Sequence, residues 1–327
     1  EVRESDCYMN IGPMFHSAVF AALSFIVNGT KIVTLNFEPR RALEVIQQEG
    51  VTSFTAVATM INYLTETANA NSFDTSSLRL IVYGGSPISV VTLRRAMKAF
   101  KGADFLQVMA QTESGVLSLL SPEEHRRALE TENFRVLESC GRGAVLSEVR
   151  IVNEAGHDVP KDGKTPGEML VRGPGVMKGY WNMPELTAAT LRDGWCYSGD
   201  IATWDENGFM YVVDRKKDMI ISGGENIYSS VVEEAVCKHP AVKECAVIGV
   251  PHQVFGETVK AVVVLHEGRA ATAEEIIGAC KEHLASYMKP TSVDFATELP
   301  KTPAGKILKR VLREKYWGGE KRQVGGV

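Results

Sequence analysis

The stretch from Leu78 to Glu113 decides the fold, and it reads LRLIVYGGSPISVVTLRRAMKAFKGADFLQVMAQTE. Residues 78–83 and 105–109 are apolar runs of strand length, and residues 88–100 between them place apolar side chains at helical spacing. This order predicts two parallel strands joined by a crossover helix. Ligands of such sheets bind beyond the carboxyl ends of the strands. Those ends are Tyr83-Gly84-Gly85-Ser86-Pro87 and Met109-Ala110-Gln111-Thr112-Glu113.

The same alternation continues toward the N-terminus. Residues 39–49 show helical spacing and stop at Gly50, the residue type that commonly terminates a helix. Residues 51–57 have the composition of a strand, and residues 59–68 that of a helix. We therefore predict that residues 1–135 form an α/β part built on a parallel sheet.

A different pattern runs from residue 136 to residue 213. Short strand-like segments at 145–152, 167–172 and 209–213 are separated by glycine and proline. This pattern predicts a small antiparallel, barrel-like sheet. Together with the α/β part, it forms the predicted large-domain portion of the chain, residues 1–213.

Five consecutive charged residues at 214–218, DRKKD, follow the β-rich part. A charge run is usually a solvated turn, but this one separates two differently patterned regions, so it predicts a domain boundary. Residues 219–327 then alternate helical and strand patterns, with helices at 229–239 and 273–286. The sequence thus predicts a small α+β C-terminal domain.

Composition excludes several classes of protein. The chain has 327 residues, of which 44% are hydrophobic and 23% charged, an ordinary balance for a globular protein. No apolar run approaches the roughly 20 residues of a membrane span, and the six cysteines contain no C-x-x-C pair. We therefore expect no transmembrane segment, no zinc ribbon, and reduced thiols in a cytoplasmic protein.

Charge is unevenly distributed along the chain. The net charge of -4 gives no sign of nucleic-acid binding, yet residues 301–327 carry eight Lys or Arg against two Glu. This basic segment is either a solvated helix face or a field that attracts an anionic ligand such as a polyphosphate.

Single motifs decide little. The glycines from Gly173 to Gly179 have the wrong spacing for a dinucleotide-binding loop, so that reading is rejected. The Gly223-Gly224 pair is consistent with a phosphate-binding nest, and also with a tight turn that needs positive φ, which is the simpler reading.

Seven motifs follow one another along nearly the whole chain. They are Pro13-Met14-Phe15-His16, Tyr83-Gly84-Gly85-Ser86-Pro87, Gln111-Thr112-Glu113, Gly179-Tyr180-Trp181, Tyr197-Ser198-Gly199-Asp200, Asp214-Arg215-Lys216-Lys217 and Pro300-Lys301-Thr302-Pro303-Ala304-Gly305-Lys306. Taken in this order, they resemble the motifs of the adenylate-forming acyl-CoA synthetases, a superfamily that includes luciferases and the adenylation domains of peptide synthetases.

The resemblance implies a two-step reaction. ATP and a carboxylic acid give an acyl-adenylate and pyrophosphate, and the thiol of coenzyme A then displaces AMP. Lys306 would neutralise charge during adenylation, Thr112 would donate to the α-phosphate, and Glu113 would bind Mg²⁺. The ATP- and AMP-binding residues implied are Gly84, Gly85, Ser86, Pro87, Gln111, Thr112, Asp200 and Arg215, with Asp200 accepting hydrogen bonds from the ribose hydroxyls.

The remaining implied roles concern the acid, the thiol and the motion between steps. Lys217 matches the hinge about which the C-terminal domain, a mobile lid, turns. The acyl pocket would be lined by His16, Thr59, Met60 and Tyr63, and coenzyme A would lie against Ser222, Gly223 and Gly224. The apolar lining favours a fatty acid, with aryl acids nearly as well supported.

The chain also departs from the family's pattern. The family's Ser/Thr/Gly-rich phosphate-gripping loop has no counterpart here, so we expect an incomplete large domain, in a natural fragment or a truncated chain. Met109-Ala110 stands where the family usually has Tyr-Gly, which puts the stacking contact with adenine in question. The alternatives left open are an adenylation domain that loads a carrier protein and a non-catalytic binding fragment. A homodimer also stays open.

Overall fold

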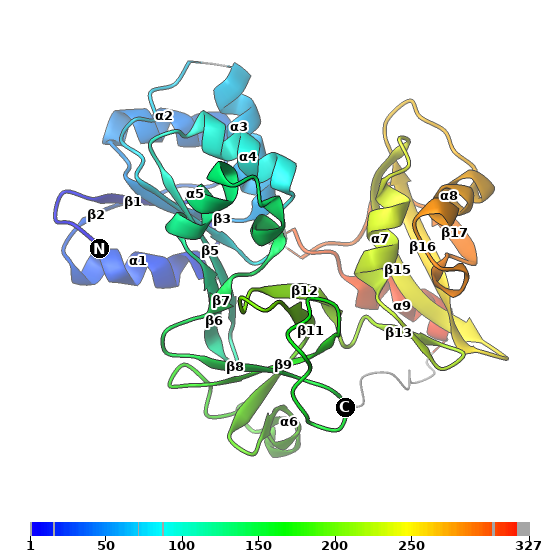
Figure 1. Cartoon of the computed structure of the whole chain (residues 1–327). Helices are drawn as coiled ribbons and strands as arrows, with labels where there is room; N and C mark the ends of the chain where they lie inside the picture. Colours follow the sequence, from blue (N-terminus) through cyan, green and yellow to red (C-terminus); the bar gives the residue numbers. More distant parts are fainter. Residues whose placement is uncertain (1, 16, 71, 87, 303–304, 319–327) are drawn as a thin grey trace.

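The computed structural model describes residues 2–15, 17–70, 72–86, 88–302 and 305–318. Within them the chain forms three β-sheets in sequence order, each with its own helices (Figure 1). The predicted His16, Pro87, Pro303 and Ala304 lie outside the described residues. None of the described helices is long and apolar enough to cross a membrane.

The first sheet has seven strands in the order β2-β1-β3-β4-β5-β6-β7. The pairs among β1 to β5 are parallel, and β6 and β7 add antiparallel strands at one edge. The strands are β1 Cys7–Asn10, β2 Lys31–Thr34, β3 Ser53–Ala56, β4 Leu80–Gly84, β5 Asp104–Gln111, β6 Gly115–Leu120 and β7 Arg142–Gly143. The predicted parallel α/β sheet is confirmed.

Helices cover this sheet. They are α1 Ser17–Val27, α2 Pro39–Glu49, α3 Ala58–Ala70, α4 Val90–Ala99 and α5 Pro122–Glu130, with a 3₁₀ turn at Phe134–Glu138. Helix α2 has the predicted bounds, because Gly50 at φ 63° closes it. Helix α4 starts two residues later than predicted, because the Ser89 hydroxyl caps it by accepting from the Thr92 amide.

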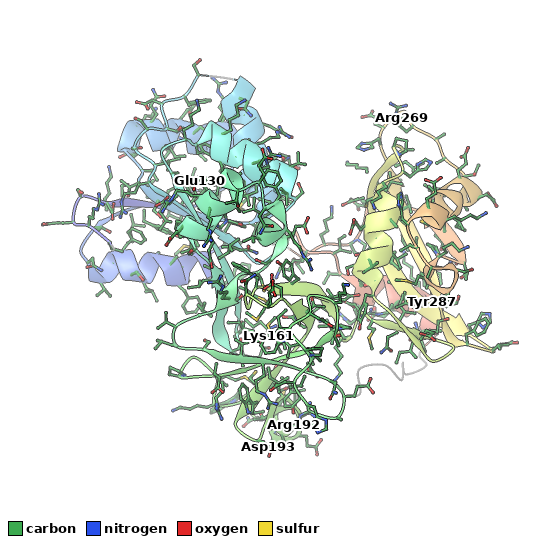
Figure 2. The ribbon with its side chains drawn as sticks, in the orientation of Figure 1. Glu130, Lys161, Arg192, Asp193, Arg269 and Tyr287 are labelled. Carbon is green, nitrogen blue, oxygen red and sulfur yellow. The ribbon has the colours of Figure 1, made fainter. Side chains whose placement is uncertain are left out.

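The second sheet is antiparallel throughout, as predicted. Its strands are β8 Glu148–Val152, β9 Gly167–Arg172, β10 Leu191–Arg192, β11 Trp195–Trp204 and β12 Met210–Arg215, with helix α6 Pro184–Thr190 before β10. Arg192 and Asp193 mark its outer turn in Figure 2. Asp193 and Gly194 both have positive φ there, as a two-residue hairpin requires.

The third sheet joins β14-β13-β16-β15, with β17 parallel to β16. Its strands are β13 Ile220–Ser222, β14 Glu225–Ile227, β15 Val242–His252, β16 Gly256–Leu265 and β17 Ser292–Phe295, and its helices are α7 Ser229–Cys237, α8 Ala273–Ala279 and α9 Lys309–Trp317. The predicted helix over 273–286 was too long. It ends after Gly278, a poor helix former, and continues as 3₁₀ turns at Cys280–Glu282 and Ser286–Met288.

The third sheet buries both of its faces. Cys245 and Val247 of β15 pack in one apolar cluster, whereas Ala246 and Ile248 pack in another that includes Leu312 of α9. Alternate residues of a strand point to opposite faces, so this near-continuous apolar strand is expected for a sheet covered on both sides. The α+β character predicted for this region is confirmed.

Candidate active site

The glycine-rich end of β4 lies beside β5. Gly84 is paired with Val108, and a Cβ on Gly84 would lie 2.1 Å from the Val108 carbonyl oxygen, so only glycine fits. Gly85 follows at φ 76° and is exposed. Close strand packing at Gly84 and positive φ at Gly85 each explain why glycine occupies that position. The two residues also leave backbone without side chains at the carboxyl edge of the parallel sheet.

A bulge in β11 aims Asp200. The register between β11 and β9 shifts between Tyr197 and Ile201, and Gly199 within the bulge has φ 71°. The Ser198 hydroxyl accepts from the Asp200 amide at 3.1 Å. Bulges commonly re-aim a side chain, and here the register between β11 and β12 places Arg215 directly opposite Asp200.

The Asp200 carboxylate joins the first and second sheets. Its Oδ2 accepts from Gln111 Nε2 at 2.5 Å, and its Oδ1 pairs with Arg215 Nε at 2.5 Å. Burial raises the pKa of Asp200, although the charge of Arg215 and the Gln111 hydrogen bond oppose that shift. The predicted nucleotide-binding residues Gln111 and Arg215 therefore both contact a third, Asp200.

Thr112 and Glu113 follow β5 in a turn. Thr112 is exposed, and the Glu113 carbonyl accepts from the Met177 amide at 2.8 Å. The Tyr180 hydroxyl donates to Glu113 Oε1 at 2.9 Å. Among the described residues no group of three or more His, Cys, Asp or Glu could hold a metal ion. Glu113 nevertheless fits Mg²⁺, which commonly binds through one carboxylate, substrate phosphates and waters.

Lys306 comes from the other side, on the loop between β17 and α9. In Figure 1 this salmon-coloured segment runs from the third sheet toward the first. The Lys306 amide donates to Thr302 Oγ1 at 3.1 Å, and Lys301 and Ile307 form a β-bridge around the turn. Burial and the charge of Arg215 lower the pKa of Lys306, whereas Asp200 raises it. The loop thus brings the ammonium close to the Asp200–Arg215 pair.

Lys217 lies in the tight turn that connects the second and third sheets. The Asp218 and Met219 amides both donate to the Arg215 carbonyl, at 2.8 and 3.0 Å. Lys217 itself is exposed, and Asp218 pairs with Arg313 of α9 at 2.7 Å. The predicted hinge residue therefore occupies the short connection between the two parts of the chain.

Three of the four predicted acyl-pocket residues, Thr59, Met60 and Tyr63, lie on α3, and the fourth, His16, is outside the described residues. Thr59 and Tyr63 are exposed, and Met60 is half-buried and packs against the core of the first sheet. Their common helix follows β3, at the same carboxyl edge as Gly84.

The predicted coenzyme A residues form a hairpin turn. Ser222 pairs with Glu225, and Gly223 and Gly224 between them have φ 60° and 89°, the conformation of a type I′ turn. The Gly223 amide donates to the Phe255 carbonyl at 2.9 Å. The simpler reading of these glycines, a tight turn, is confirmed.

Two residues with no role assigned from the sequence contact the site. Ser198 supports the Asp200 turn, and Tyr180 holds Glu113. Both belong to the quoted motifs, so their positions were visible. The Ser198 contact spans two residues and is a local turn, whereas the Tyr180–Glu113 hydrogen bond joins residues 67 positions apart and cannot be read from spacing.

Comparison with known proteins gives the same answer along the whole chain. Residues 1–181 match the family model described as AMP-binding enzyme, and residues 231–306 match the AMP-binding enzyme C-terminal domain. A feruloyl-CoA synthase of an Amycolatopsis species is 41% identical over 93% of this chain and 60% of its own length. A medium/long-chain-fatty-acid–CoA ligase of Mycobacterium tuberculosis is 37% identical over 96% of this chain and 55% of its own.

Solved structures agree. An amide bond synthetase from Marinactinospora thermotolerans matches with a TM-score of 0.84 and 32% identity, over 96% of this chain and 62% of that one. The o-succinylbenzoate CoA synthetase of Bacillus subtilis, in complex with its acyl-adenylate intermediate, matches with a TM-score of 0.81 and 32% identity, over 95% of this chain and 61% of that one.

The fold and its glycine-rich strand ends are those of an adenylate-forming enzyme. The chain belongs to the family of AMP-binding enzymes, whose relatives here are acyl-CoA ligases. It spans about 60% of the length of the curated relatives it matches first.

Proposed function

We propose that the protein is an ATP-dependent acid–thiol ligase, which makes an acyl-CoA through an acyl-adenylate and releases AMP and pyrophosphate. The observation that supports this most is the position of Asp200, which is buried between Gln111 and Arg215 and within reach of the charge of Lys306. A nucleotide site needs acceptors for the ribose, and phosphoryl transfer needs a cation near the phosphates.

In this proposal the second sheet and the strand ends hold the nucleotide. Asp200 accepts from the ribose hydroxyls with Arg215 beside it, and the backbone at Gly84, Gly85 and Ser86 lies against adenine. Thr112 donates to the α-phosphate. Mg²⁺, when bound at Glu113, would neutralise phosphate charge.

Lys306 then stabilises the charge that develops as the acid attacks the α-phosphorus. Its loop belongs to residues 219–327, which we propose as a lid domain. Residues 1–213 form the partial large domain, and residues 214–218, with Lys217, form the hinge. Rotation about this hinge would replace Lys306 by the Ser222-Gly223-Gly224 turn at the site, where coenzyme A binds.

The acid is proposed to be apolar. Met60 and Tyr63 on α3 supply an apolar lining, and among the relatives a fatty-acid ligase and a feruloyl-CoA synthase represent both apolar acyl and aryl acids. Fatty acids are the first candidates and aryl acids the second. The six free cysteines support a cytoplasmic location, where thiols stay reduced.

A second acceptor deserves a test. A fatty acid–[acyl-carrier-protein] ligase of Streptomyces coeruleorubidus is 32% identical over 90% of this chain, so a carrier-bound thiol is the alternative to coenzyme A. A chain that binds nucleotide without catalysis is the other alternative, since the phosphate-gripping loop of the family has no counterpart in this sequence.

One experiment separates these possibilities. Pyrophosphate release is measured with fatty and aryl acids, and product formation is measured with coenzyme A or with a phosphopantetheinylated carrier protein as acceptor. Acid-dependent pyrophosphate release and an acyl-CoA product support the proposal. If only the acyl-carrier product forms, the function is carrier loading instead. If the chain binds AMP but no acid causes pyrophosphate release, the chain is a non-catalytic binding fragment.

A further inference from the structure

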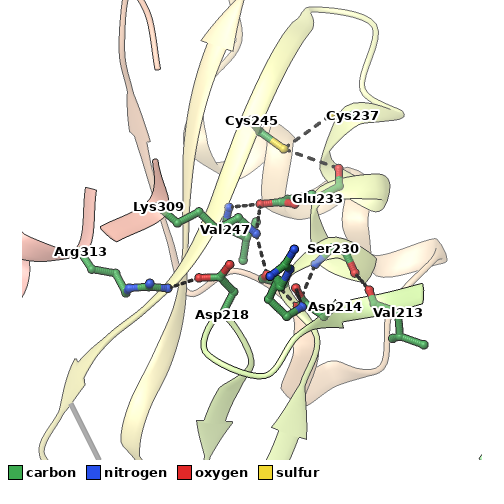
Figure 3. A network of polar contacts seen from close by, with 12 residues as sticks. Val213, Asp214, Asp218, Ser230, Glu233, Cys237, Cys245, Val247, Lys309 and Arg313 are labelled. Atoms are coloured by element: carbon green, nitrogen blue, oxygen red, sulfur yellow. Dashed lines mark hydrogen bonds and ion pairs between the residues drawn. The ribbon is translucent and has the colours of Figure 1, made fainter. Parts of the chain in front are cut away.

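Two of the six cysteines touch each other in the third sheet. All six lie among the described residues, and five of them are buried, whereas Cys237 is exposed. Cys237 is the last residue of α7, and its Sγ lies 3.5 Å from Sγ of Cys245 on β15 (Figure 3). The single exposed thiol of the chain is therefore in contact with a buried one.

The geometry favours a bond between these sulfur atoms. A disulfide has an S–S length of about 2.05 Å, so the two atoms need to approach by about 1.5 Å. Cys237 lies at a helix terminus, and the register of β15 against β16 is irregular between Val242 and Glu244, just before Cys245. Cys245 itself is paired with Val263, so the required shift falls mainly on Cys237 at the end of the helix.

The two thiols have different chemical environments. Hydrogen bonding with Cys245 lowers the pKa of Cys237, although partial desolvation of this thiol and the nearby Glu233 and Glu244 carboxylates oppose that shift. Cys245 is surrounded by the apolar cluster of the sheet, and its contact with Cys237 together with burial raises its pKa. The Glu233 carbonyl, 3.6 Å from Cys245 Sγ, is the other acceptor available to the Cys245 S–H. Cys237 is therefore the thiol that meets an oxidant first, and Cys245 is held ready beside it.

We propose that Cys237 and Cys245 form an oxidisable dithiol, a modification site that a peroxide converts into an intrachain disulfide. The Cys237 thiolate attacks one peroxide oxygen, the O–O bond breaks, and the departing hydroxide takes a proton to become water. Cys245 then attacks the sulfur of the Cys237 sulfenic acid, the S–O bond breaks, and the hydroxide leaves with the Cys245 proton as a second water. In sum, two thiols lose two electrons to one peroxide.

The disulfide would act on α7, which touches both the hinge and the Lys306 loop. At its first turn the Ser229 hydroxyl donates to Asp214 Oδ2 at 2.8 Å, and Glu233 pairs with Lys309 at 2.7 Å (Figure 3). Lys309 starts α9, three residues after Lys306. A bond between Cys237 and β15 would therefore fasten the far end of the helix that supports these two contacts.

The test treats the reduced, folded chain with one equivalent of hydrogen peroxide, blocks free thiols with N-ethylmaleimide after denaturation, and maps the peptides by mass spectrometry. We expect a peptide pair joined through Cys237 and Cys245, lighter by two hydrogens, that dithiothreitol separates. Amide exchange of α7 should slow in the oxidised chain and recover on reduction. The Cys280→Ser variant, which alters a buried thiol elsewhere in the same domain, should form the same pair.

Two variants decide between the dithiol and a merely exposed cysteine. Cys245→Ala should stop oxidation at the Cys237 sulfenic acid, which dimedone traps, and Cys237→Ser should slow labelling of the native chain by at least about tenfold. Chains linked to each other through Cys237, or overoxidised Cys237 with Cys245 still a free thiol in the wild-type chain, would overturn the proposal. Circular dichroism of each variant checks that it folds.

Discussion

Asp200 and Lys306 are held in opposite ways, although the charge of each acts on the other. Asp200 is 1% exposed and fixed by a bulge, an amide and a guanidinium from three strands. Lys306 is exposed as a residue, although the protein around its ammonium partly shields it from water, and its backbone is held by hydrogen bonds within its own loop, to Thr302. The proposed ribose acceptor is therefore fixed between the first two sheets, whereas the proposed catalytic cation lies on a loop next to the third sheet.

Removing the Lys306 ammonium is expected to have the largest effect on catalysis. In a form of the protein that turns over, Lys306→Ala should slow acid-dependent pyrophosphate release by about 10²- to 10³-fold, because the variant lacks the charge that stabilises the transition state. Lys301→Ala is the matched control, since Lys301 lies in the same loop but pairs with Glu244 at 2.6 Å. Equal activity of the two variants would assign Lys306 to the solvated surface.

Replacing the fixed acceptor should weaken nucleotide binding by about 100-fold, because one acceptor oxygen becomes an NH2 donor and the hydrogen bond to the other oxygen loses its charge. The change is Asp200→Asn, the measurement is calorimetric titration with AMP, and the control is Glu168→Gln, which breaks the 2.8 Å pair with Lys216 in the same sheet. Unchanged AMP affinity in Asp200→Asn would separate Asp200 from the ribose.

We also expect the AMP affinity of the wild-type protein to depend on pH through Asp200, with Asp200→Asn as the reference that lacks this carboxylate. The pKa of Asp200 is raised, mainly by burial, so the carboxylate is protonated at a higher pH than an ordinary aspartate. As pH falls through this raised pKa, wild-type affinity for AMP should drop toward that of Asp200→Asn. The ratio of the two affinities is the quantity to measure, because protonation of AMP itself affects both proteins alike. A ratio that stays constant down to pH 4 would contradict the raised pKa.

The folding stability of the first sheet should depend on the ion pair between Asp6 and Arg79. Asp6 accepts from the Arg3 amide at 2.7 Å and pairs with Arg79 before β4, which lowers its pKa from 3.8 to about 2. A depressed carboxyl pKa stabilises the fold above the unfolded value, and this contribution disappears as pH falls toward 2.

Asp6→Asn should therefore lower the free energy of unfolding by about 2 kcal/mol at pH 7 and by almost nothing near pH 2. Urea denaturation at several pH values measures this difference. Asp158→Asn, which breaks an exposed pair with Arg150, should cost less than about 1 kcal/mol. A pH-independent effect at Asp6 would indicate lost packing instead of lost charge pairing.

A smaller effect on catalysis is expected from a substitution at Lys217, in the turn that connects the second and third sheets. Lys217→Pro fixes φ near −65°, so it should slow thioester formation by about tenfold while leaving adenylation nearly unchanged. Lys217→Ala is the control that removes the side chain but keeps backbone freedom. Equal loss in both half-reactions would remove Lys217 from the hinge.

Local features of the fold could be predicted from the sequence, and long-range ones could not. Gly50 and the apolar spacing predicted α2 with its exact bounds, and the apolar spacing alone predicted α4, because caps and periodicity act within a few residues. The Ser89 cap, which sets the start of α4, was missed. The contact between Gln111 and Asp200 joins residues 89 positions apart and depends on a strand bulge. No local pattern encodes that register, so only the family resemblance brought these two residues together beforehand.

The central claim is that the site combines a fixed acceptor with a cation delivered for one step only. Its most direct test supplies preformed acyl-adenylate and coenzyme A to Asp200→Ala and Lys306→Ala and measures single-turnover acyl-CoA formation beside adenylation. The account predicts that Asp200→Ala slows both half-reactions, whereas Lys306→Ala slows adenylation and forms acyl-CoA at close to the wild-type rate. If Lys306→Ala slowed both half-reactions as Asp200→Ala does, Lys306 would be a permanent part of the site and the claim would be wrong.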